Sequence, residues 1–383
     1  MSSKIRLGFV GGGANSMIGV LHRIASGMFD RFEIVGGVFG SDIDQSLSFG
    51  DRLGVDLTRV YPSPESLVEA ERRLPESERM EVVSVLTPNY LHFENARLLL
   101  ENGFHVICEK PLTTSLNDAI ELAKLHDMSQ KVFAVTYTYT GYPMIRQMRD
   151  MIKEGTIGKV QKIDAQYFQG WINPIIHDPE ERKNTWRLQP EKSGISCCIG
   201  DIGTHAFDMI EYVSGLKVNT VLSDLNYLYE DNPMDVDGSI LIRCEKGVKG
   251  CIRASQIATA EENSFEIKIY GDKGGLKWQQ ENPNYLYWMK EGVPMQVLKP
   301  GNTYNSALSL DGTKLPSGHP EGIFDAMGNI YHGVARAIRL ESYDEGEFPA
   351  ITVGLRGLVC WGVVVAAHEG GGGWGVGGGV GVG

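Results

Sequence analysis

The sequence predicts an α/β protein in which a doubly wound parallel sheet is followed by a second domain built on an antiparallel sheet. Three observations support this fold class. Over residues 1–136, short apolar runs alternate with amphipathic stretches, which is the pattern of a parallel sheet covered on both faces. From residue 137 onward, longer runs alternate between apolar and polar residues, as strands of an open sheet do. The chain also has 383 residues, more than one hydrophobic core usually supports.

The first domain is predicted from alternating elements. Its strands are the apolar runs Ile5–Val10, Glu33–Phe39, Glu81–Leu86, His105–Cys108 and Val132–Thr136. Its helices are the segments between them: Ile18–Ser26, Gln45–Leu53, the stretch around Ser66–Ala70, Tyr90–Asn102 and Leu116–Ser129. Ser115 is the predicted N-cap of the last helix, because serine oxygen accepts hydrogen bonds from the free amides of a first turn.

The second domain is predicted over residues 137–360. Its helices are Pro143–Glu154, Gly203–Val213 and Glu321–Arg339, and its strands are Val160–Phe168, Val218–Leu228, Gly238–Arg243, Lys249–Ser255 and Ser264–Tyr270. Residues 361–383 are set apart as a glycine-rich tail of doubtful identity, since ten of the fourteen residues from Gly370 to Gly383 are glycine. Such a segment cannot form an ordinary helix or core strand, and no function is assigned to it.

Composition excludes several classes of partner. The formal net charge is −12 and Lys and Arg form no cluster, so neither nucleic acid nor an anionic membrane is expected. The chain opens directly into strand-like sequence and has no apolar stretch long enough to cross a bilayer. The six cysteines form no C-x-x-C pair, which predicts neither disulfides nor a metal site. We therefore expect a cytoplasmic protein that binds small molecules and copies of itself.

A glycine-rich turn follows the first strand. Gly11-Gly12-Gly13-Ala14-Asn15-Ser16-Met17-Ile18 is a variant of the dinucleotide fingerprint with Ser16 at its third position. Backbone amides of the turn and the following helix can bind a pyrophosphate, so the predicted cofactor contacts here are Gly11, Gly13, Ala14, Asn15, Ser16 and Ile18. At the end of the second strand, Ser41 and Asp42 follow Gly40. Asp42 favours NAD, whereas the small Gly40 and Ser41 leave NADP open.

Two further motifs follow strands of the same sheet. Thr87-Pro88-Asn89-x-x-His92 comes after Val82–Leu86, and Glu109-Lys110-Pro111 comes after Val106–Cys108. Ligands bind at the carboxyl edge of doubly wound sheets, so Thr87, Pro88, Asn89, His92, Glu109 and Lys110 are predicted cofactor contacts. A plain helix start capped by Asn89 is the alternative explanation of the first motif. Lys110 precedes a proline and is thereby held in an extended or turn conformation, which we expect to direct its ammonium group into the crevice at this edge.

These ordered motifs resemble the Gfo/Idh/MocA family of NAD(P)-dependent sugar and cyclitol oxidoreductases. The resemblance runs from about residue 4 to residue 355 and includes Gly155-Thr156-Ile157-Gly158-Lys159-Val160 and Trp186-Arg187 ahead of Gly200-Asp201-Ile202-Gly203-Thr204-His205. It implies a Rossmann domain followed by an α/β domain with a large, open, mainly antiparallel sheet. It also implies that Lys110 polarises the reacting oxygen, that His205 is the general acid/base, and that Asp201 orients the histidine or the substrate.

Spacing supports the second motif independently. Asp201 and His205 are four residues apart, so both side chains lie on one face if the segment is helical. Where the family often has glycines before this motif, the chain has Gly194-Ile195-Ser196-Cys197-Cys198-Ile199. We interpret the two cysteines as small buried packing residues. The predicted substrate contacts are Lys110, Tyr139, Trp186, Arg187, Asp201 and His205.

The predicted function is hydride transfer between a nicotinamide cofactor and a secondary alcohol or ketone of a sugar, cyclitol or glycoside. Two alternatives stay open. One uses tightly bound NAD for elimination, hydrolysis or oxidoreduction between sugars. The other is a nucleotide-sensing protein without redox chemistry, because fold alone does not guarantee activity. The family architecture implies a homodimer or homotetramer formed through the open sheet.

Overall fold

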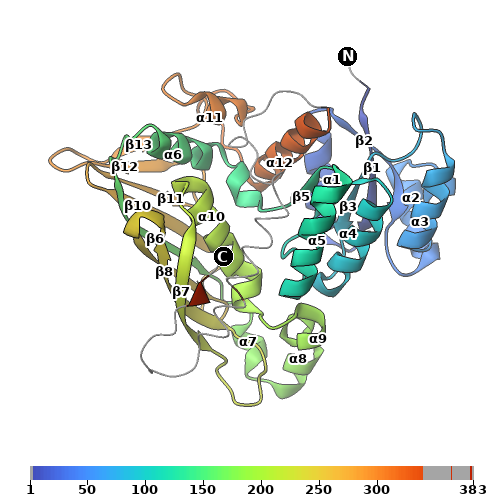
Figure 1. Ribbon diagram of the computed structural model, residues 1–383, viewed down its shortest axis with the longest axis horizontal. Helices are drawn as coiled ribbons and strands as arrows, with labels where there is room; N and C mark the ends of the chain where they lie inside the picture. Colours follow the sequence, from blue (N-terminus) through green and yellow to red (C-terminus); the bar gives the residue numbers. More distant parts are fainter. Residues whose placement is uncertain (1–2, 340–363, 365–379, 382–383) are drawn as a thin grey trace. The chain divides into compact units, whose positions relative to one another are not determined.

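The computed structural model describes residues 3–339, 364 and 380–381. The described chain forms two compact units (Figure 1). The first contains residues up to Thr138 together with the helix residues from Met327 onward, and the second contains Tyr139–Ala326. Their elements are given separately below.

The first unit contains a parallel sheet with strand order β2-β1-β3-β4-β5. Its strands are β1 (Ile5–Gly11), β2 (Phe32–Val38), β3 (Val82–Leu86), β4 (His105–Cys108) and β5 (Phe133–Val135). Its helices are α1 (Met17–Gly27), α2 (Ile43–Leu53), α3 (Pro64–Arg73), α4 (His92–Glu101), α5 (Leu116–Ser129) and, from the distant end of the chain, most of α12 (Ile323–Ile338). The predicted N-cap is confirmed, since the Asp118 amide donates to the Ser115 hydroxyl over 3.1 Å.

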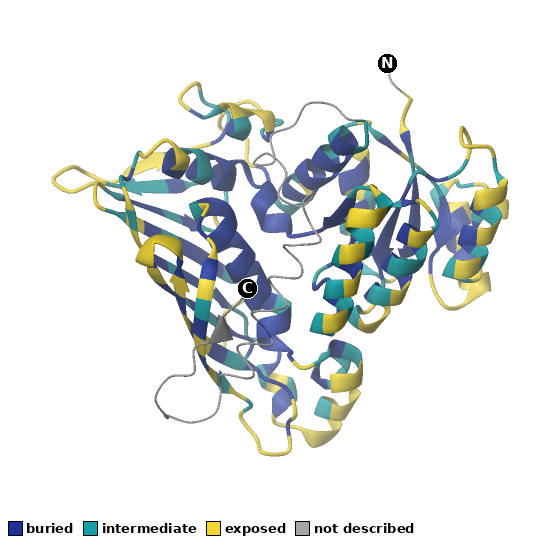
Figure 2. Ribbon diagram, viewed as in Figure 1, coloured by how far each residue is buried: buried dark blue, intermediate teal, exposed yellow. Residues whose placement is uncertain are grey.

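Both faces of this sheet are covered. Side chains that alternate along β1 and β3 share one core with Ala25 of α1 and Ile330 and Val334 of α12. The intervening residues, such as Val83 and Val85, are also fully buried, and α4 packs on β3 and β4. Burial on both faces explains why these strands are short continuous apolar runs. Figure 2 shows the strands buried and the outer residues of α2 and α3 exposed.

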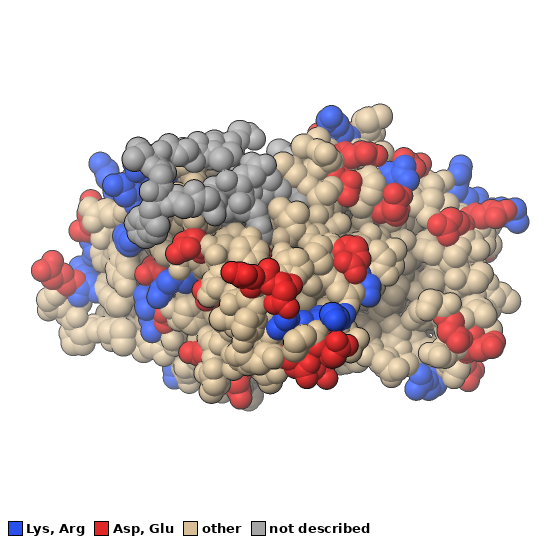
Figure 3. Space-filling model, turned by 90° about the horizontal axis from the view of Figure 1, so that it is seen from below, with Lys and Arg blue, Asp and Glu red and all other residues tan. Residues whose placement is uncertain are grey.

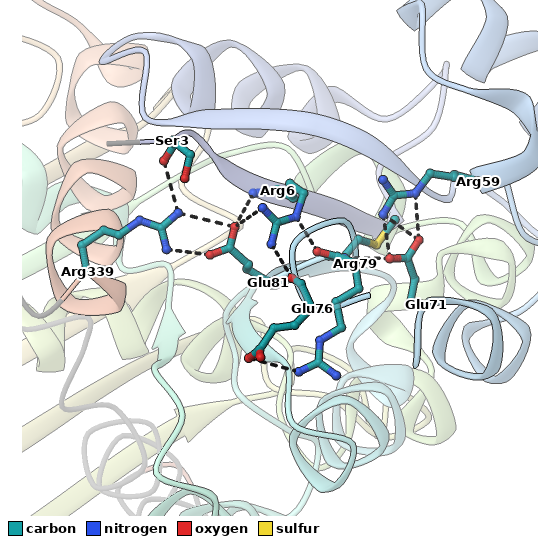
Figure 4. A network of polar contacts seen from close by, with 9 residues as sticks. Ser3, Arg6, Arg59, Glu71, Glu76, Arg79, Glu81 and Arg339 are labelled. Carbon is teal, nitrogen blue, oxygen red and sulfur yellow. Dashed lines mark hydrogen bonds and ion pairs between the residues drawn. The ribbon is translucent and has the colours of Figure 1, made fainter. Parts of the chain in front are cut away.

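Ion pairs fasten the edge of this sheet at which β1 and β3 begin (Figure 4). Glu81 pairs with Arg6 over 3.2 Å and with Arg339 over 2.6 Å. The fully buried carboxylate of Glu71 pairs with Arg59 over 2.6 Å. This end of the sheet is therefore structural, because strand-following loops, where ligands bind, lie at the other end.

The second unit contains a sheet with strand order β13-β12-β11-β10-β6-β9-β8-β7-β14. Its pairs are antiparallel except β6 with β9. The strands are β6 (Val160–Phe168), β7 (Val218–Asn226), β8 (Asp237–Cys244), β9 (Lys249–Ser255), β10 (Ser264–Gly271), β11 (Gly275–Gln279), β12 (Leu286–Met289), β13 (Gln296–Leu298) and β14 (Val380–Gly381). The predicted fold class is thus confirmed.

Helices cover one face of the second sheet (Figure 1). They include α6 (Pro143–Lys153) and the almost completely buried α10 (Thr204–Ser214), while shorter helical segments are α7 (Asn173–Ile176), α8 (Pro179–Asn184), α9 (Pro190–Ser193) and α11 (Ala307–Asp311). The opposite face carries exposed side chains, among them Leu222 and Leu241, which are register partners on β7 and β8. One buried and one open face explain the strict alternation along β8.

The predicted boundaries agree with the structure to within a few residues, but four strands were missed. These are β11, β12, β13 and the two-residue β14, all of which are short. Residues 361–383 lie almost entirely outside the described residues. In the described chain no helix is long and apolar enough to cross a membrane. Acidic and basic side chains are interspersed on the face shown in Figure 3.

Candidate active site

The glycine-rich turn leaves β1 through two residues in the left-handed region. Gly11 has φ +86° and Gly12 has φ +70°, conformations that side chains with a Cβ rarely adopt. Gly13 is required for a different reason: a Cβ there would lie 2.1 Å from the Phe39 carbonyl oxygen at the end of β2. The turn is therefore compact enough for backbone amides to approach a ligand closely.

The same turn packs tightly against the first helix. A Cβ on Gly19 would lie 2.2 Å from the Gly12 carbonyl oxygen, so α1 can approach the turn only because Gly19 has no side chain. Ser16 caps the helix by accepting the Gly19 amide over 3.0 Å. Gly19 thus performs the close helix packing that sequence reasoning looked for at Ser16. A glycine-lined turn leading into a capped helix N-terminus fits a dinucleotide pyrophosphate.

Asp42 lies at the N-terminus of the next helix. Its side chain caps α2 by accepting the Gln45 amide over 2.9 Å, and both Ser41 and Asp42 are exposed. Beside the turn, Arg23 of α1 donates a hydrogen bond to the Gly12 carbonyl and stacks 4.8 Å from the Phe49 ring centre. Burial lowers the pKa of Arg23. The acidic Asp42 and the basic Arg23 therefore both lie on helices that flank the glycine-rich turn.

His92 holds two strand-following loops together. Its Nδ1 lies 2.8 Å from the Pro111 carbonyl oxygen and its Nε2 lies 2.8 Å from the Thr87 carbonyl oxygen. Burial lowers the pKa of His92, although the hydrogen bonds to the two carbonyl oxygens by themselves raise it. The side chain is buried, whereas Pro88 and Asn89 begin the helical turn before α4. His92 therefore links the segment at Thr87 to the segment at Pro111.

Glu109 and Lys110 follow β4 directly. The Glu109 carboxylate accepts hydrogen bonds from His22 Nε2 over 2.9 Å, from the Thr136 hydroxyl, and from the Lys110 amide over 3.2 Å. Burial alone raises the pKa of Glu109, but the hydrogen bond and charge of His22, followed by the charge of Lys110, outweigh it and lower the pKa. The carboxylate is therefore ionised and surrounded by donors within the unit.

Asp201 and His205 lie on one continuous helical segment. A π-helical turn, Ile199–Gly203, carries Asp201 and leads directly into α10, whose first turn carries His205. The wide turn arises where the Thr204 amide donates to the Ile199 carbonyl. Such π-turns often occur at functional sites because they re-aim side chains. The predicted helix Gly203–Val213 is thus present, and the condition on which the spacing of Asp201 and His205 depends is met, although the turn that carries Asp201 is wider than an α-helical turn.

The carboxylate of Asp201 is held by two side chains. Gln256, which is fully buried, donates to Asp201 Oδ2 over 2.9 Å. Arg187 Nε lies 3.6 Å from the same oxygen. The Arg187 guanidinium also stacks on Trp186, 4.4 Å from its ring centre, and lies 5.6 Å from that of Trp171. Two of the predicted substrate residues, Trp186 and Arg187, therefore adjoin Asp201.

The imidazole of His205 packs against buried tyrosines. Its ring centre lies 4.7 Å from that of Tyr139 and 6.1 Å from that of Tyr167. Tyr167 donates to Asn263 over 2.5 Å and accepts from Tyr139 over 2.5 Å. Burial, followed by the neighbouring Tyr139, raises the pKa of Tyr167, so its phenol stays neutral. Tyr139 is therefore buried beside His205, with its hydroxyl engaged by Tyr167.

The segment that precedes Asp201 is anchored by a carboxylate that sequence reasoning missed. Asp235, fully buried, accepts the amides of Cys197 over 2.9 Å and Ile199 over 2.7 Å. Both Cys197 and Cys198 are buried, which confirms their interpretation as packing residues, and burial raises the pKa of each thiol. Nothing local to Asp235 or Gln256 in the sequence marks either residue, since each acts on a segment at least 36 positions away.

The structure thus groups the predicted residues by unit. The glycine turn, Thr87 to His92, Glu109 and Lys110 belong to the first unit, and Tyr139, Trp186, Arg187, Asp201 and His205 belong to the second. Residues 5–137 match the model of an oxidoreductase family with an NAD-binding Rossmann fold. Residues 145–277 match the model of the GFO/IDH/MocA C-terminal domain. The chain belongs to the Gfo/Idh/MocA family of oxidoreductases.

Relatives of this Gfo/Idh/MocA chain include both named enzymes and solved structures. An uncharacterized oxidoreductase, YfiI of Bacillus subtilis, is 32% identical over 368 residues, covering 94% of this chain and 93% of the relative. The levoglucosan dehydrogenase of Pseudarthrobacter phenanthrenivorans is 30% identical over 229 residues, covering 54% of this chain and 57% of that enzyme. An inositol dehydrogenase homolog from Azotobacter vinelandii, complexed with NADH and myo-inositol, superposes with a TM-score of 0.87 at 32% identity, covering 100% of this chain and 98% of that one.

The family membership establishes the general activity. The chain is an oxidoreductase with an NAD-binding domain, and its relatives include dehydrogenases of sugars and cyclitols. Its glycine turn and capped α1 supply the backbone geometry that a dinucleotide requires. The prediction of family, fold and enzyme class is confirmed.

Proposed function

We propose that this protein is an NAD(P)-dependent dehydrogenase or reductase that acts on a secondary alcohol or ketone of a cyclic polyol, sugar or glycoside. The observation that carries the proposal is the anchoring of Asp201, Arg187 and the π-helical turn beside His205. An enzyme that binds hydroxyl-rich substrates needs such fixed polar groups next to flat apolar rings. Trp171 and Trp186 supply rings of this kind beside Arg187.

The residues take distinct roles in the proposed reaction. The nicotinamide, when bound, accepts or donates the hydride at the carbon bearing the reacting oxygen. Lys110 donates a hydrogen bond to that oxygen and stabilises its negative charge. During oxidation, His205 takes the hydroxyl proton, and during reduction it returns this proton. Asp201 orients the histidine or a substrate hydroxyl, with its own orientation set by Gln256.

NAD is the proposed cofactor. Its pyrophosphate would be held by the turn at Gly11 and Gly13 and by amides near Ser16, with Ser41 and Asp42 at the ribose. The carboxylate of Asp42 would repel the 2′-phosphate of NADP. In Asp42→Ser, we expect the ratio of kcat/KM for NAD to that for NADP to fall, and an unchanged ratio would contradict this assignment.

A coupled screen tests the reaction. Purified protein is mixed with NAD⁺ or NADP⁺ and with inositols, aldoses, anhydrosugars or glycosides, and reduced nicotinamide is followed by its absorbance. On the active substrate, Lys110→Met and His205→Asn should each lower kcat by about 10²–10⁴-fold with nucleotide affinity largely retained. The exposed Lys124 and His177 provide matched controls, Lys124→Met and His177→Asn, one in each unit.

The outcomes separate the alternatives. Near-wild-type turnover in Lys110→Met or His205→Asn would overturn the assigned roles. If the wild-type protein showed no activity with any substrate and either nucleotide, its assignment as a simple dehydrogenase would be wrong. The protein would then be denatured and the released NAD(H) measured. Retained NAD(H) would favour redox-assisted elimination, hydrolysis or sugar oxidoreduction. Absence of NAD(H) would favour a nucleotide-sensing role.

The open sheet face is the proposed site of self-association. Leu222 and Leu241 face each other on β7 and β8, and both are about half exposed. Exposed apolar side chains on a sheet face are typical of interfaces between copies of a chain. Light scattering should give a dimer or tetramer for the wild-type protein and a smaller species for Leu241→Glu. A monomeric wild-type protein would contradict the proposal.

A further inference from the structure

A buried chain of hydrogen bonds runs beneath the Glu109-Lys110 segment. It connects Ser84 of β3, Tyr331 of α12, His22 of α1 and Glu109 at the end of β4. The Ser84 hydroxyl lies 2.9 Å from the Tyr331 hydroxyl, which lies 2.8 Å from His22 Nδ1, and His22 Nε2 lies 2.9 Å from Glu109 Oε1. These residues are at most 8% exposed. Buried polar side chains that lie this close together are stable only when each forms a hydrogen bond.

The donors and acceptors of this chain can be assigned. Glu109 is ionised and only accepts, so His22 Nε2 carries a proton and donates to it. With a neutral imidazole, Nδ1 accepts from the Tyr331 hydroxyl, which in turn accepts from Ser84. With an imidazolium, every bond between Nδ1 and Ser84 reverses and remains satisfied. The orientation of the Glu109 carboxylate is therefore maintained in either state of His22.

The Glu109 carboxylate connects this hydrogen-bond chain to Lys110. Its Oε1 atom is held by His22 and by the Thr136 hydroxyl at the end of β5. Its Oε2 atom accepts the backbone amide of Lys110 over 3.2 Å. The hydrogen bond to this amide fixes the plane of the peptide between Glu109 and Lys110. The negative charge of Glu109 is also adjacent to Lys110, whose ammonium group the proposed reaction requires. The most distant member of this chain in the sequence is Tyr331, 221 positions after Lys110.

We infer that His22 and Tyr331 are positioning residues for Lys110, acting through Glu109. This inference rests on the proposed function, in which Lys110 binds the reacting oxygen. Without His22, Glu109 loses a charge-assisted donor and keeps the Thr136 hydroxyl at Oε1, so its carboxylate is held less firmly and its bond to the Lys110 amide weakens. A shift of about 1 Å in a group that binds the reacting atoms is enough to lower turnover by about 10²-fold.

Three variants test the inference on the full-length protein. His22→Leu removes the donor to Glu109, His22→Gln keeps an amide donor, and Tyr331→Phe removes only the hydroxyl that contacts His22. Tyr61→Phe is the matched control, because the Tyr61 hydroxyl is also buried and donates to a carboxylate, that of Glu71, over 2.7 Å. Both Tyr→Phe changes should lower thermal stability similarly, since each removes one buried hydrogen bond.

The readouts are kcat, KM, the Kd for NADH, and a spectroscopic signal from Lys110. For the last, lysines are reductively methylated with ¹³C and the Lys110 resonance is identified by its loss in Lys110→Arg. We expect kcat to fall at least tenfold in His22→Leu and by a smaller factor in Tyr331→Phe, with partial rescue in His22→Gln. KM and the Kd for NADH should change less than threefold. In the nucleotide-free state, the Lys110 resonance of each variant should be shifted from its wild-type position.

Two results would overturn the inference. One is wild-type kcat in His22→Leu together with an unshifted Lys110 resonance. The other is an equal loss of kcat in Tyr331→Phe and Tyr61→Phe, which would show a general effect of lost stability. Failure of the proposed function is distinguishable, because the wild-type protein would then be inactive in the substrate screen while the Lys110 resonance still reports on His22.

Discussion

The approach of α1 to the glycine turn provides a sharp test of how the nucleotide site is built. A Cβ on Gly19 would meet three backbone atoms of Gly12, at 2.2, 2.7 and 2.7 Å. Ordinary contact begins near 3.4 Å, so the oxygen and the new carbon must separate by about 1.2 Å. Backbone atoms cannot rotate away as a flexible side chain does. In Gly19→Ala, the helix or the turn must therefore move.

The expected cost follows from overpacking. Inserting a methyl group into a closely packed site typically costs about 1–3 kcal/mol. If the turn absorbs the movement, this strain weakens NADH binding by about 5- to 150-fold, since each 1.4 kcal/mol is a factor of ten. Gly27 ends the same helix, and a Cβ added there would meet no atom within 4 Å, so Gly27→Ala is the matched control. Alanine is favoured over glycine in a helix by up to about 1 kcal/mol.

Fluorescence titration with NADH and urea unfolding measure the two consequences. Gly19→Ala should bind NADH at least fivefold more weakly or unfold at lower urea, whereas Gly27→Ala should bind normally and be at least as stable as the wild-type protein. The reasoning would be refuted if Gly19→Ala bound NADH within twofold of wild type and unfolded at the same urea concentration.

Three further predictions concern carboxylates and the side chains that hold them. Glu71→Ala should lower the free energy of unfolding by about 3–5 kcal/mol, because it leaves the partly buried Arg59, the buried Tyr61 hydroxyl and the Met80 amide without their shared acceptor. Glu69→Ala on the same helix removes an exposed pair worth less than about 1 kcal/mol, and equal urea midpoints for the two variants would contradict this. Burial alone raises the pKa of Glu81, but its two arginine partners outweigh it and lower the pKa below the ordinary 4.5. Its ionised form therefore stabilises the fold above about pH 4.5, and the stability deficit of Glu81→Gln should shrink as pH falls through the lowered pKa; a pH-independent deficit would show that charge is not the cause. Gln256→Leu should lower kcat about tenfold or more without changing the Kd for NADH, because it releases Asp201; an unchanged kcat would exclude that positioning role.

Local sequence predicted most elements because the signals that specify them are local. The apolar run of β4 and the serine cap of α5 have the predicted bounds and partner. The helix predicted from Gly203 onward is present, and the structure extends the helical segment back through Asp201. Its π-helical turn was not foreseen, and the Cys197 and Ile199 amides that lead into this turn are capped by Asp235, a residue on a different segment.

The position of α12 shows a similar limit. Its apolar stripe predicted an amphipathic helix, and position in the chain assigned it to residues 137–360. In the structure its residues from Met327 pack with the first unit, where Tyr331 and Val334 join the core of the parallel sheet. An apolar stripe predicts that a face is buried, but not which surface buries it.

The sequence by itself determined the fold class, the order of strands and helices, the family, and the motifs that follow β1, β3 and β4. The elements and motifs follow from periodicity and turn chemistry, which act over a few neighbouring positions, and the family follows from the resemblance that the ordered motifs carry. Tertiary structure alone decided which distant groups complete those motifs. His22 and Tyr331 are 309 positions apart, and Gln256 and Asp201 are 55 apart. Such pairs form because a buried polar group must find a partner wherever packing places one, and no local pattern encodes that choice.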